Sequence, residues 1–399
     1  MKLPAATYSV IANPRAARGT GVSSAPFADG LAATQGALDD IRGWPGYAPT
    51  PLCDLPDLAD AIHVDCLRYK DEGQRFGIKS FKPFGGGYAV ARILAGQVMR
   101  ETGAVSVSSA DLLGGQYDAL LKLLTVACAT DGNHGRAVAW MARTFGCQAV
   151  VYLASHVSRL REDAIRELGA EVVRTEGNHD AAVRQAAEDS AREGWAFVTQ
   201  MATATDSQIP VDILTGYSAL FAECGEQWGD DDVPTHLFVQ CGVGGLAAAG
   251  AAYAELQWGR ERPTVVVVEA ENAASVCASV AAGSPQSITG SLDTVMGGLA
   301  AGEVSEAAWP ILDAGVDFCV TIPDEAAIDT MRLLAENDPS VEGGEAGVAG
   351  LAAVLAVAQA DEARGLLGLE DASRVLTIGT EGATDPELYE QLVGIAPKP

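Results

Sequence analysis

The chain has 399 residues, of which 48% are hydrophobic, and a formal net charge of −27. This length is sufficient for a large buried core and for two domains. Because the strong negative charge repels polyanions, we expect neither nucleic acid nor an anionic membrane surface as a partner.

Targeting and metal-binding signals are absent from the sequence. No apolar run approaches the roughly 18 residues of a membrane span, and the N-terminus has no apolar core of a signal peptide. The eight cysteines and five histidines are scattered, without a CxxC pair or a zinc-like spacing. We therefore expect a cytoplasmic protein with no metal site, in which most cysteines are buried thiols. Spacing does not decide whether any pair forms a disulfide.

The chain begins with a segment that is predicted to be mostly loop, and predicted strands and helices then alternate along the rest of it. Residues 1–50 are rich in Gly, Pro and Ala and are predicted to be mostly loop, and 51–69 predict a short helix leading into a strand. Apolar spacing predicts a helix at 88–102. Further strands are expected at 125–130, 149–153, 170–174, 196–200, 236–240, 264–269 and 374–379. Further helices are expected from about 136, and at 159–168, 180–193, 213–228, 246–257, 324–336 and 346–361.

Short β-branched strands alternating with alanine-rich helices are typical of parallel sheets flanked by helices on both faces. No linker divides the chain. We therefore expect two α/β domains with the chain crossing between them: a larger one from residues 1–90 and 211–399, and a smaller one from residues 91–210. Ligands of such sheets bind beyond the carboxyl ends of the strands, where the glycine-rich turns of this chain lie.

The stretch 70–90 contains three of only six lysines, and two of these, Lys79 and Lys82, are three positions apart. Lys82 stands between Phe81 and a turn of three glycines, Gly85–Gly87. A lysine beside backbone that can approach a ligand closely is suited to forming an imine with a carbonyl cofactor. An exposed lysine before a helix is the alternative, and this stretch alone does not decide between them.

A second candidate is the turn Gly242-Val243-Gly244-Gly245, between an expected strand and an expected helix. Backbone N–H groups of consecutive glycines and the start of a helix favour an anion, most naturally a phosphate. The segment also fits the dinucleotide pattern G-x-G-x-x-A, with the acidic Glu269 ending the next strand. A purely structural tight turn is the remaining alternative.

The third candidate, the turn TDGNHG, joins the expected strand 125–130 to a helix and carries Thr130, Asp131, Asn133 and His134. A helix cap needs only one such residue, so a cluster of four polar side chains favours a functional role. Each one separately is also compatible with a structural role.

Two further turns follow the same logic. Thr380 offers a hydroxyl at the end of the last expected strand, and Glu345 starts an expected helix, where a favourable contact with the helix dipole is the alternative. A lysine, a phosphate cradle, an asparagine turn and a terminal hydroxyl together match the needs of pyridoxal 5′-phosphate.

The ordered segments KDEGQRFGIKSFKPFGGGYAV, ATDGNHGRAVAWMA, IPVDILTGY, QCGVGGLAAAG, GGEAGVAGL and GTEGATD resemble the fold type II pyridoxal-phosphate enzymes. This is the group of tryptophan synthase β and threonine dehydratase. Within it the chain resembles the diaminopropionate ammonia-lyases. The resemblance implies a lyase with pyridoxal phosphate in the larger domain, a small amino-acid substrate and a homodimer. It implies conversion of 2,3-diaminopropionate to pyruvate and ammonia.

The resemblance also implies roles for individual residues. Lys82, and not Lys79, matches the Schiff-base lysine, and Asp131 matches an active-site acid–base group. The residues implied to bind the cofactor are Lys82, Phe81, Asn133, Gly242, Val243, Gly244, Gly245, Leu246 and Thr380. The backbone around Thr130 and His134 is the expected site of the substrate carboxylate.

One departure from the family pattern concerns the substrate. Met201 occupies a place where the lyases have an aspartate associated with proton abstraction from the D-isomer, so activity on a D-substrate is in doubt. Whether Asp206 substitutes for it is left open. The alternatives are a threonine- or serine-dehydratase-like lyase, another β-substituted amino-acid lyase, and a catalytically inactive relative that binds the cofactor. A nicotinamide oxidoreductase explains neither Lys82 nor the TDGNHG turn.

Overall fold

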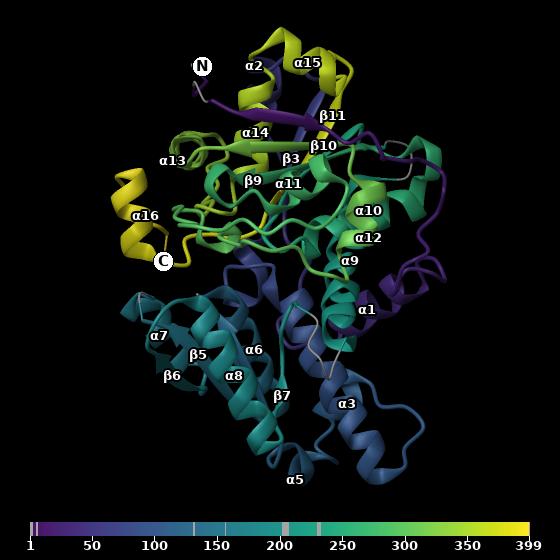
Figure 1. Ribbon diagram of the computed structural model, residues 1–399, viewed down its shortest axis with the longest axis vertical. Helices are drawn as coiled ribbons and strands as arrows, with labels where there is room; N and C mark the ends of the chain where they lie inside the picture. Colours follow the sequence, from purple (N-terminus) through teal and green to yellow (C-terminus); the bar gives the residue numbers. More distant parts are fainter. Residues whose placement is uncertain are drawn as a thin grey trace.

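The computed structural model describes residues 3–4, 7–130, 132–155, 157–201, 207–229 and 233–398. Figure 1 shows two sheets, each with its own helices, one above the other. The larger unit, with seven strands, holds both ends of the chain, and the smaller unit has four strands. These units take their strands from the segments that the sequence assigned to two domains, and the domain boundaries themselves stay a prediction.

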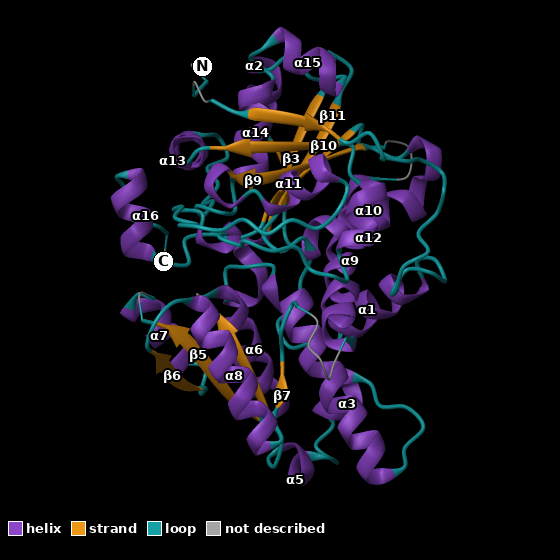
Figure 2. Cartoon of the chain, viewed as in Figure 1, coloured by secondary structure: helices purple, strands orange, loops and turns teal. Residues whose placement is uncertain are grey.

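The seven-stranded sheet has the order β1-β10-β9-β8-β11-β3-β2 (Figure 2). Its strands are β1 (Ser9–Ala12), β2 (Leu52–Asp54), β3 (Cys66–Asp71), β8 (His236–Gln240), β9 (Thr264–Ala270), β10 (Phe318–Ile322) and β11 (Arg374–Gly379). The five central strands are parallel, and the two edge strands, β1 and β2, are antiparallel to their neighbours. Strand β9 is buried on both faces, which explains its continuous run of four valines.

The four-stranded sheet has the order β6-β5-β4-β7 and is parallel throughout. Its strands are β4 (Thr125–Thr130), β5 (Gln148–Ala154), β6 (Glu171–Thr175) and β7 (Ala196–Phe197). The helices that connect them are α6 (Asn133–Phe145), α7 (Arg159–Arg166) and α8 (His179–Glu193). The polar turn between β4 and α6 therefore lies at the carboxyl end of a strand, as the sequence pattern predicted.

The remaining helices cover the larger sheet or connect the two units. They are α1 (Ala32–Arg42), α2 (Pro56–Ala61), α3 (Tyr88–Thr102), α4 (Ser109–Leu113), α5 (Asp118–Leu121), α9 (Gln208–Trp228), α10 (Gly245–Trp258), α11 (Ser275–Ala282), α12 (Trp309–Gly315), α13 (Asp324–Glu336), α14 (Ala349–Val357), α15 (Asp361–Leu367) and α16 (Pro386–Val393). Helix α9 packs against α1, α3 and α10, and it therefore forms the central support of the molecule.

One expected helix was wrong in length, and several elements were not predicted. Outside β1 and α1, the described residues of 1–50 lie in no helix or strand, so the prediction of a loop-rich segment is confirmed; α1 buries Thr34, Ala37, Leu38 and Ile41 at helical spacing. The expected helix 346–361 is shorter: α14 ends at Val357, and the extended backbone at Ala360 separates it from α15, which begins at Asp361. The elements that were not predicted are strands β1, β2 and β10 and helices α1, α4, α5, α11, α12 and α16.

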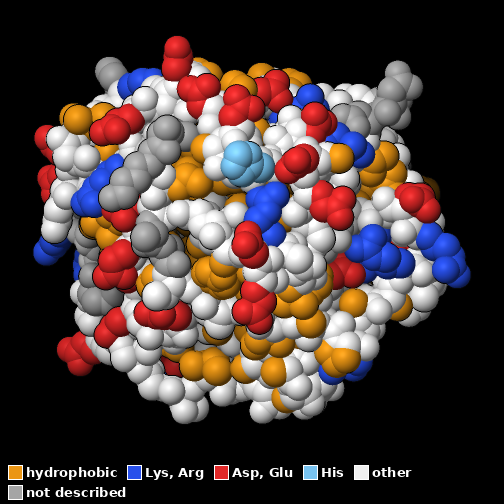
Figure 3. Space-filling view, turned by 90° about the horizontal axis from the view of Figure 1, so that it is seen from above, with side chains coloured by type: hydrophobic (Ala, Val, Ile, Leu, Met, Phe, Trp, Pro, Cys, Tyr) orange, Lys and Arg blue, Asp and Glu red, His pale blue; other side chains and the backbone are white. Residues whose placement is uncertain are grey.

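The surface and the thiols agree with the composition. On the face shown in Figure 3, acidic side chains are spread over the surface between basic and apolar ones. All eight cysteines lie within the described residues and are free thiols. Among the described helices, none has the length and apolar character needed to cross a membrane.

Candidate active site

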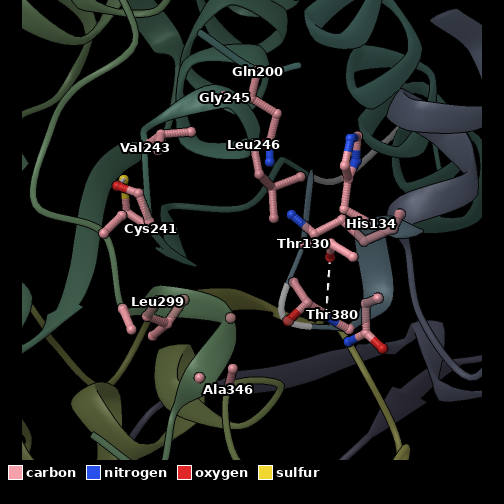
Figure 4. Close-up of a pocket in the computed structure, with 18 of the residues that line it drawn as sticks. Thr130, His134, Gln200, Cys241, Val243, Gly245, Leu246, Leu299, Ala346 and Thr380 are labelled. Carbon is pink, nitrogen blue, oxygen red and sulfur yellow. Dashed lines mark hydrogen bonds between the residues drawn. The ribbon is translucent and has the colours of Figure 1, made fainter. Parts of the chain in front are cut away.

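A cavity of about 220 Å³ lies where the two units meet. Its walls come from the segment before α3, the β4–α6 turn, the segment after β7, and the carboxyl ends of β8 and β11. It contains the candidate residues that the sequence suggested and the structure describes: Phe81, Lys82, Thr130, Asn133, His134, Gly242, Val243, Gly244, Gly245, Leu246, Thr380 and Glu345. Asp131 lies outside the described residues. Figure 4 shows ten labelled members of this lining around the cavity.

Lys82 is placed by an unusual turn. It precedes a π-helical turn, Pro83–Gly87, which leads directly into α3. The Lys82 Nζ atom lies 4.8 Å from the centre of the Phe81 ring. Burial lowers the pKa of the Lys82 amine to about 8, although the charge of Glu381 acts in the opposite direction. A larger fraction of this amine than of an ordinary lysine amine is therefore neutral, and nucleophilic, near neutral pH.

The lysine turn is tied to the segment that follows β11. The Phe81 N–H donates to the carbonyl of Thr380 at 3.0 Å, and the Gly382 N–H donates to the carbonyl of Lys79 at 3.0 Å. Lys79 itself pairs with Glu342, with its Nζ atom 3.1 Å from the carboxylate, and does not line the cavity. Geometry thus separates the two lysines that the local sequence left open.

The glycine turn 242–245 forms the start of α10. Gly244 has φ of +103°, a conformation that residues with a Cβ rarely adopt. A Cβ on Gly242 would lie 3.1 Å from the carbonyl oxygen of Gly298, so this backbone approaches its neighbour closely. The turn presents main chain and the N-terminus of a 14-residue helix to the cavity, which is the arrangement that favours a phosphate.

Thr380 lies at the end of β11, and its hydroxyl accepts a hydrogen bond of 2.9 Å from the Gln240 side-chain amide. Since that amide occupies a lone pair of the oxygen, the hydroxyl hydrogen is left to donate, and it has no acceptor among the described residues. A neutral ring nitrogen is a suitable acceptor for such a donor. Gln240 was not identified from the sequence, because it is the last residue of an apolar strand.

In the polar turn after β4, Thr130 supports the backbone of the turn, and both Thr130 and His134 line the cavity. Thr130 Oγ1 accepts the N–H groups of Gly132 and Gly135 at 3.0 and 3.2 Å, and it therefore shapes the turn. The His134 Nε2 atom lies 3.0 Å from the carbonyl oxygen of Val198, which makes Nε2 the protonated nitrogen. Burial lowers the pKa of His134 to about 4, so the ring is neutral. In Figure 4 Thr130, His134 and Thr380 line the same side of the cavity.

Asn133 donates from its side-chain amide to the carboxylate of Glu381. The other oxygen of that carboxylate accepts the Ala346 N–H at 3.0 Å. Burial raises the pKa of Glu381, and burial together with the charge of Glu381 raises the pKa of Glu345 to about 7. Two neighbouring carboxyl groups with raised pKa values are typical of functional sites.

Tyr217 of α9 is a site residue that the sequence analysis missed. Its ring centre lies 4.9 Å from that of Phe81, and a Cβ on Gly85 would overlap it. Its hydroxyl is buried and has no hydrogen-bond partner among the described residues. Tyr217 is the last residue of the segment IPVDILTGY, which carried part of the family resemblance, but no role was assigned to it.

Two sequence alternatives can also be assessed. Glu269 does not face the glycine turn as the acid of a dinucleotide site would, because its carboxylate is fully buried and accepts the N–H groups of Val276 and Cys277 at 2.9 and 2.7 Å. Met201 does line the cavity, so an apolar side chain occupies the position at which the family pattern has an aspartate. Asp206 lies outside the described residues.

Comparisons with known proteins identify the family of the chain. Residues 44–380 match the family described as pyridoxal-phosphate dependent enzymes. The chain is 35% identical over 360 residues to the diaminopropionate ammonia-lyase of Salmonella typhimurium, covering 88% of this chain and 89% of that protein. The same enzyme of Escherichia coli K12 is 35% identical over 355 residues, covering 87% and 88%.

A solved structure of the Escherichia coli diaminopropionate ammonia lyase, in complex with an aminoacrylate-PLP azomethine reaction intermediate, has the same fold. The TM-score is 0.87 at 31% identity, with 98% of both chains covered.

Proposed function

The chain belongs to the pyridoxal-phosphate dependent enzyme family, and we propose that it is a lyase that converts 2,3-diaminopropionate to pyruvate and ammonia. Pyridoxal phosphate is its cofactor. The observation that carries the proposal is the position of Lys82: a buried amine of lowered pKa lies in one cavity with a glycine cradle at a helix N-terminus.

The described residues fit the cofactor at each of its polar groups. The N–H groups of the glycine turn 242–245 would hold the phosphate, and Lys82 would bind the aldehyde. Asn133 would contact the ring hydroxyl, and Thr380 would donate to the ring nitrogen. A hydroxyl donor leaves that nitrogen uncharged, which favours elimination over transamination. Phe81 and Leu246 complete the cavity wall.

When bound, the cofactor supplies an electron sink for the electron pair left at the substrate Cα. Lys82 removes the proton at Cα of the L-isomer, because a buried amine with a pKa of about 8 is a competent base near neutral pH. The N-terminus of α6 holds the substrate carboxylate through the backbone around Thr130 and His134.

The β-amine must be protonated before it leaves. We assign that proton to Asp131, or to the ammonium form of Lys82. The structure does not describe Asp131, so its role rests on the family pattern of the TDGNHG turn. The apolar Met201 in the cavity wall favours action on the L-isomer.

The test is a panel of β-substituted amino acids, both enantiomers of each, incubated with the cofactor-loaded protein. Diaminopropionate should yield two ammonia molecules for each pyruvate, because both nitrogens are released and one water is consumed. Equal amounts of pyruvate and ammonia from serine, without turnover of diaminopropionate, would instead identify a dehydratase. No turnover of any amino acid by protein with bound cofactor would identify an inactive relative.

Two further properties follow from the family. We propose that the protein is a homodimer and that it is cytoplasmic. The absence of a membrane-spanning helix among the described residues is compatible with both.

A further inference from the structure

One arginine connects the two units beside the cavity. Arg161 lies in α7 of the smaller unit, and its Nη2 atom is 2.9 Å from Glu345 Oε1 in the larger unit. Its Nε atom lies 3.8 Å from Oδ2 of Asp385, which caps α16. Ser158, which caps α7, donates to the same Asp385 oxygen at 3.2 Å. Figure 1 shows α7 directly below α16, so these contacts span the boundary between the units.

The same side chain touches the turn that carries the candidate site residues. A Cβ on Gly132, in the β4–α6 turn, would lie 3.5 Å from Arg161 Cδ, and one on Gly297 would lie 3.6 Å from Arg161 Nη1. Arg161 is therefore packed between the polar turn of the smaller unit and the cavity wall of the larger unit. Its side chain is 21% exposed and that of Glu345 is 5% exposed, so their ion pair is largely shielded from water.

The contact partners also relate Arg161 to the carboxyl pair. Glu345 and Glu381 are buried against each other's charge, and Arg161 lowers the pKa of both. Glu381 in turn accepts the hydrogen bond from Asn133, which belongs to the smaller unit. The cross-unit links thus run from α7 to the residue that we assign to the cofactor ring. Arg161 also lines the cavity itself.

We propose that Arg161 is a positioning residue that holds the smaller unit closed over the cavity through Glu345 and Asp385. This rests on the proposed function for the identity of the substrate, but closure itself does not depend on it. If the closed form becomes less populated, the apparent affinity for the substrate falls in proportion. Turnover at saturation changes less, because bound substrate restores the closed form.

The test compares Arg161→Met with Arg166→Met, both as cofactor-loaded proteins. Arg166 is a matched control, since it lies on the same helix and pairs with Glu162 inside the smaller unit at 2.9 Å. Without substrate, Arg161→Met should speed amide hydrogen exchange about 10-fold in residues 132–136 and 343–349. With substrate it should raise KM about 10-fold and lower kcat less than 3-fold, whereas Arg166→Met changes neither. Arg161→Lys should restore part of the loss.

A second variant keeps the proposal testable if Arg161→Met folds poorly. Asp385→Asn retains the oxygen that caps α16 by accepting from Leu388 at 3.2 Å, but it removes the charge that faces Arg161. It should raise KM by itself, and its effect should not add to that of Arg161→Lys, because both act on one contact.

The proposal would be overturned if the Arg161→Met and Arg166→Met variants had the same amide hydrogen exchange and the same KM. Fully additive effects of Asp385→Asn and Arg161→Lys on KM would overturn it as well. If the unmodified protein does not act on diaminopropionate, the proposed function fails. The exchange measurement, made without substrate, then still decides whether Arg161 closes the cavity.

Discussion

At the scale of single residues, the surroundings determine which of two chemically similar side chains is reactive. Lys79 and Lys82 are three positions apart, yet Lys79 is paired with Glu342, whereas Lys82 lines the cavity, where desolvation lowers the pKa of its amine. The local sequence did not distinguish them, and only the resemblance to a family selected Lys82. The roles of Gln240, Tyr217 and Arg161 were not predicted, because they depend on neighbours that are distant in sequence.

The protonation of Lys82 leads to a prediction for cofactor loading. Attack on the aldehyde needs the neutral amine, which predominates above the pKa of about 8. The rate of loading into cofactor-free protein should therefore rise with pH between 6.5 and 9, with a midpoint near 8, measured by stopped-flow absorbance.

Lys82→Ala should lose the visible absorbance of lysine-bound cofactor and all activity. Lys79→Ala should keep both, and a loss of absorbance in Lys79→Ala alone would reverse the assignment.

At the scale of elements, glycines set how closely the lysine turn approaches its support. Gly216 lies in the middle of α9, and a Cβ there would overlap the carbonyl oxygen of Phe84 in the π-helical turn. The spacing of apolar residues predicted α3 with its correct bounds, but it could not predict that α9 packs against the turn before it. Such close approach between backbones needs a residue without a side chain.

We expect Gly216→Ala to destabilise the protein by about 2–3 kcal/mol and to weaken cofactor retention, because the added methyl group displaces the turn that carries Lys82. The matched control is Gly36→Ala in α1, where a Cβ meets nothing within 4 Å. That change should stabilise by up to about 1 kcal/mol, since alanine is the better helix former. Urea unfolding and the absorbance of bound cofactor measure both effects, and equal stabilities of the two variants would contradict this packing argument.

At the scale of the whole molecule, a buried ionic network joins segments that are far apart in sequence. Glu223 of α9 accepts from Arg75 at 2.6 Å and from Lys70 of β3 at 2.5 Å, and all three side chains are at most 1% exposed. The Arg75 guanidinium lies 4.4 Å from the ring centre of Phe84, beside the lysine turn. The network thus connects the larger sheet, the central helix and the active-site turn.

Removing the charge of Glu223 should be costly, because it leaves two buried cations with insufficient compensation. We expect Glu223→Gln to lower the free energy of unfolding by about 3 kcal/mol. Glu226→Gln is the control on the same helix. Its side chain is 49% exposed and pairs with Arg42 at the surface, so its effect should stay below about 0.5 kcal/mol.

The pH dependence gives an independent check. Burial alone would raise the pKa of Glu223, but the charges and hydrogen bonds of Arg75 and Lys70 outweigh it and lower the pKa to about 2. A carboxyl group whose pKa is lowered by folding stabilises the fold at pH values above its ordinary, unfolded-state pKa. This contribution is lost as the pH falls through the folded-state pKa. The difference between the unmodified protein and Glu223→Gln should therefore shrink between pH 4 and pH 2. A constant difference over that range would be incompatible with an ionised Glu223.

The sequence by itself determined the alternation of strands and helices and the turns that carry the chemistry. These depend on local periodicity and on backbone requirements within a few residues, and the ordered motifs added the family. Only the tertiary structure decided which polar groups share a cavity. The walls of that cavity include the carboxyl ends of β4, β8 and β11 and the turn before α3, which are brought together by the order of the strands and the packing of the two units. For the same reason only the structure shows that Arg161, Glu345 and Asp385 lie together across the two units. They are far apart in sequence, and local sequence patterns relate only residues a few positions apart.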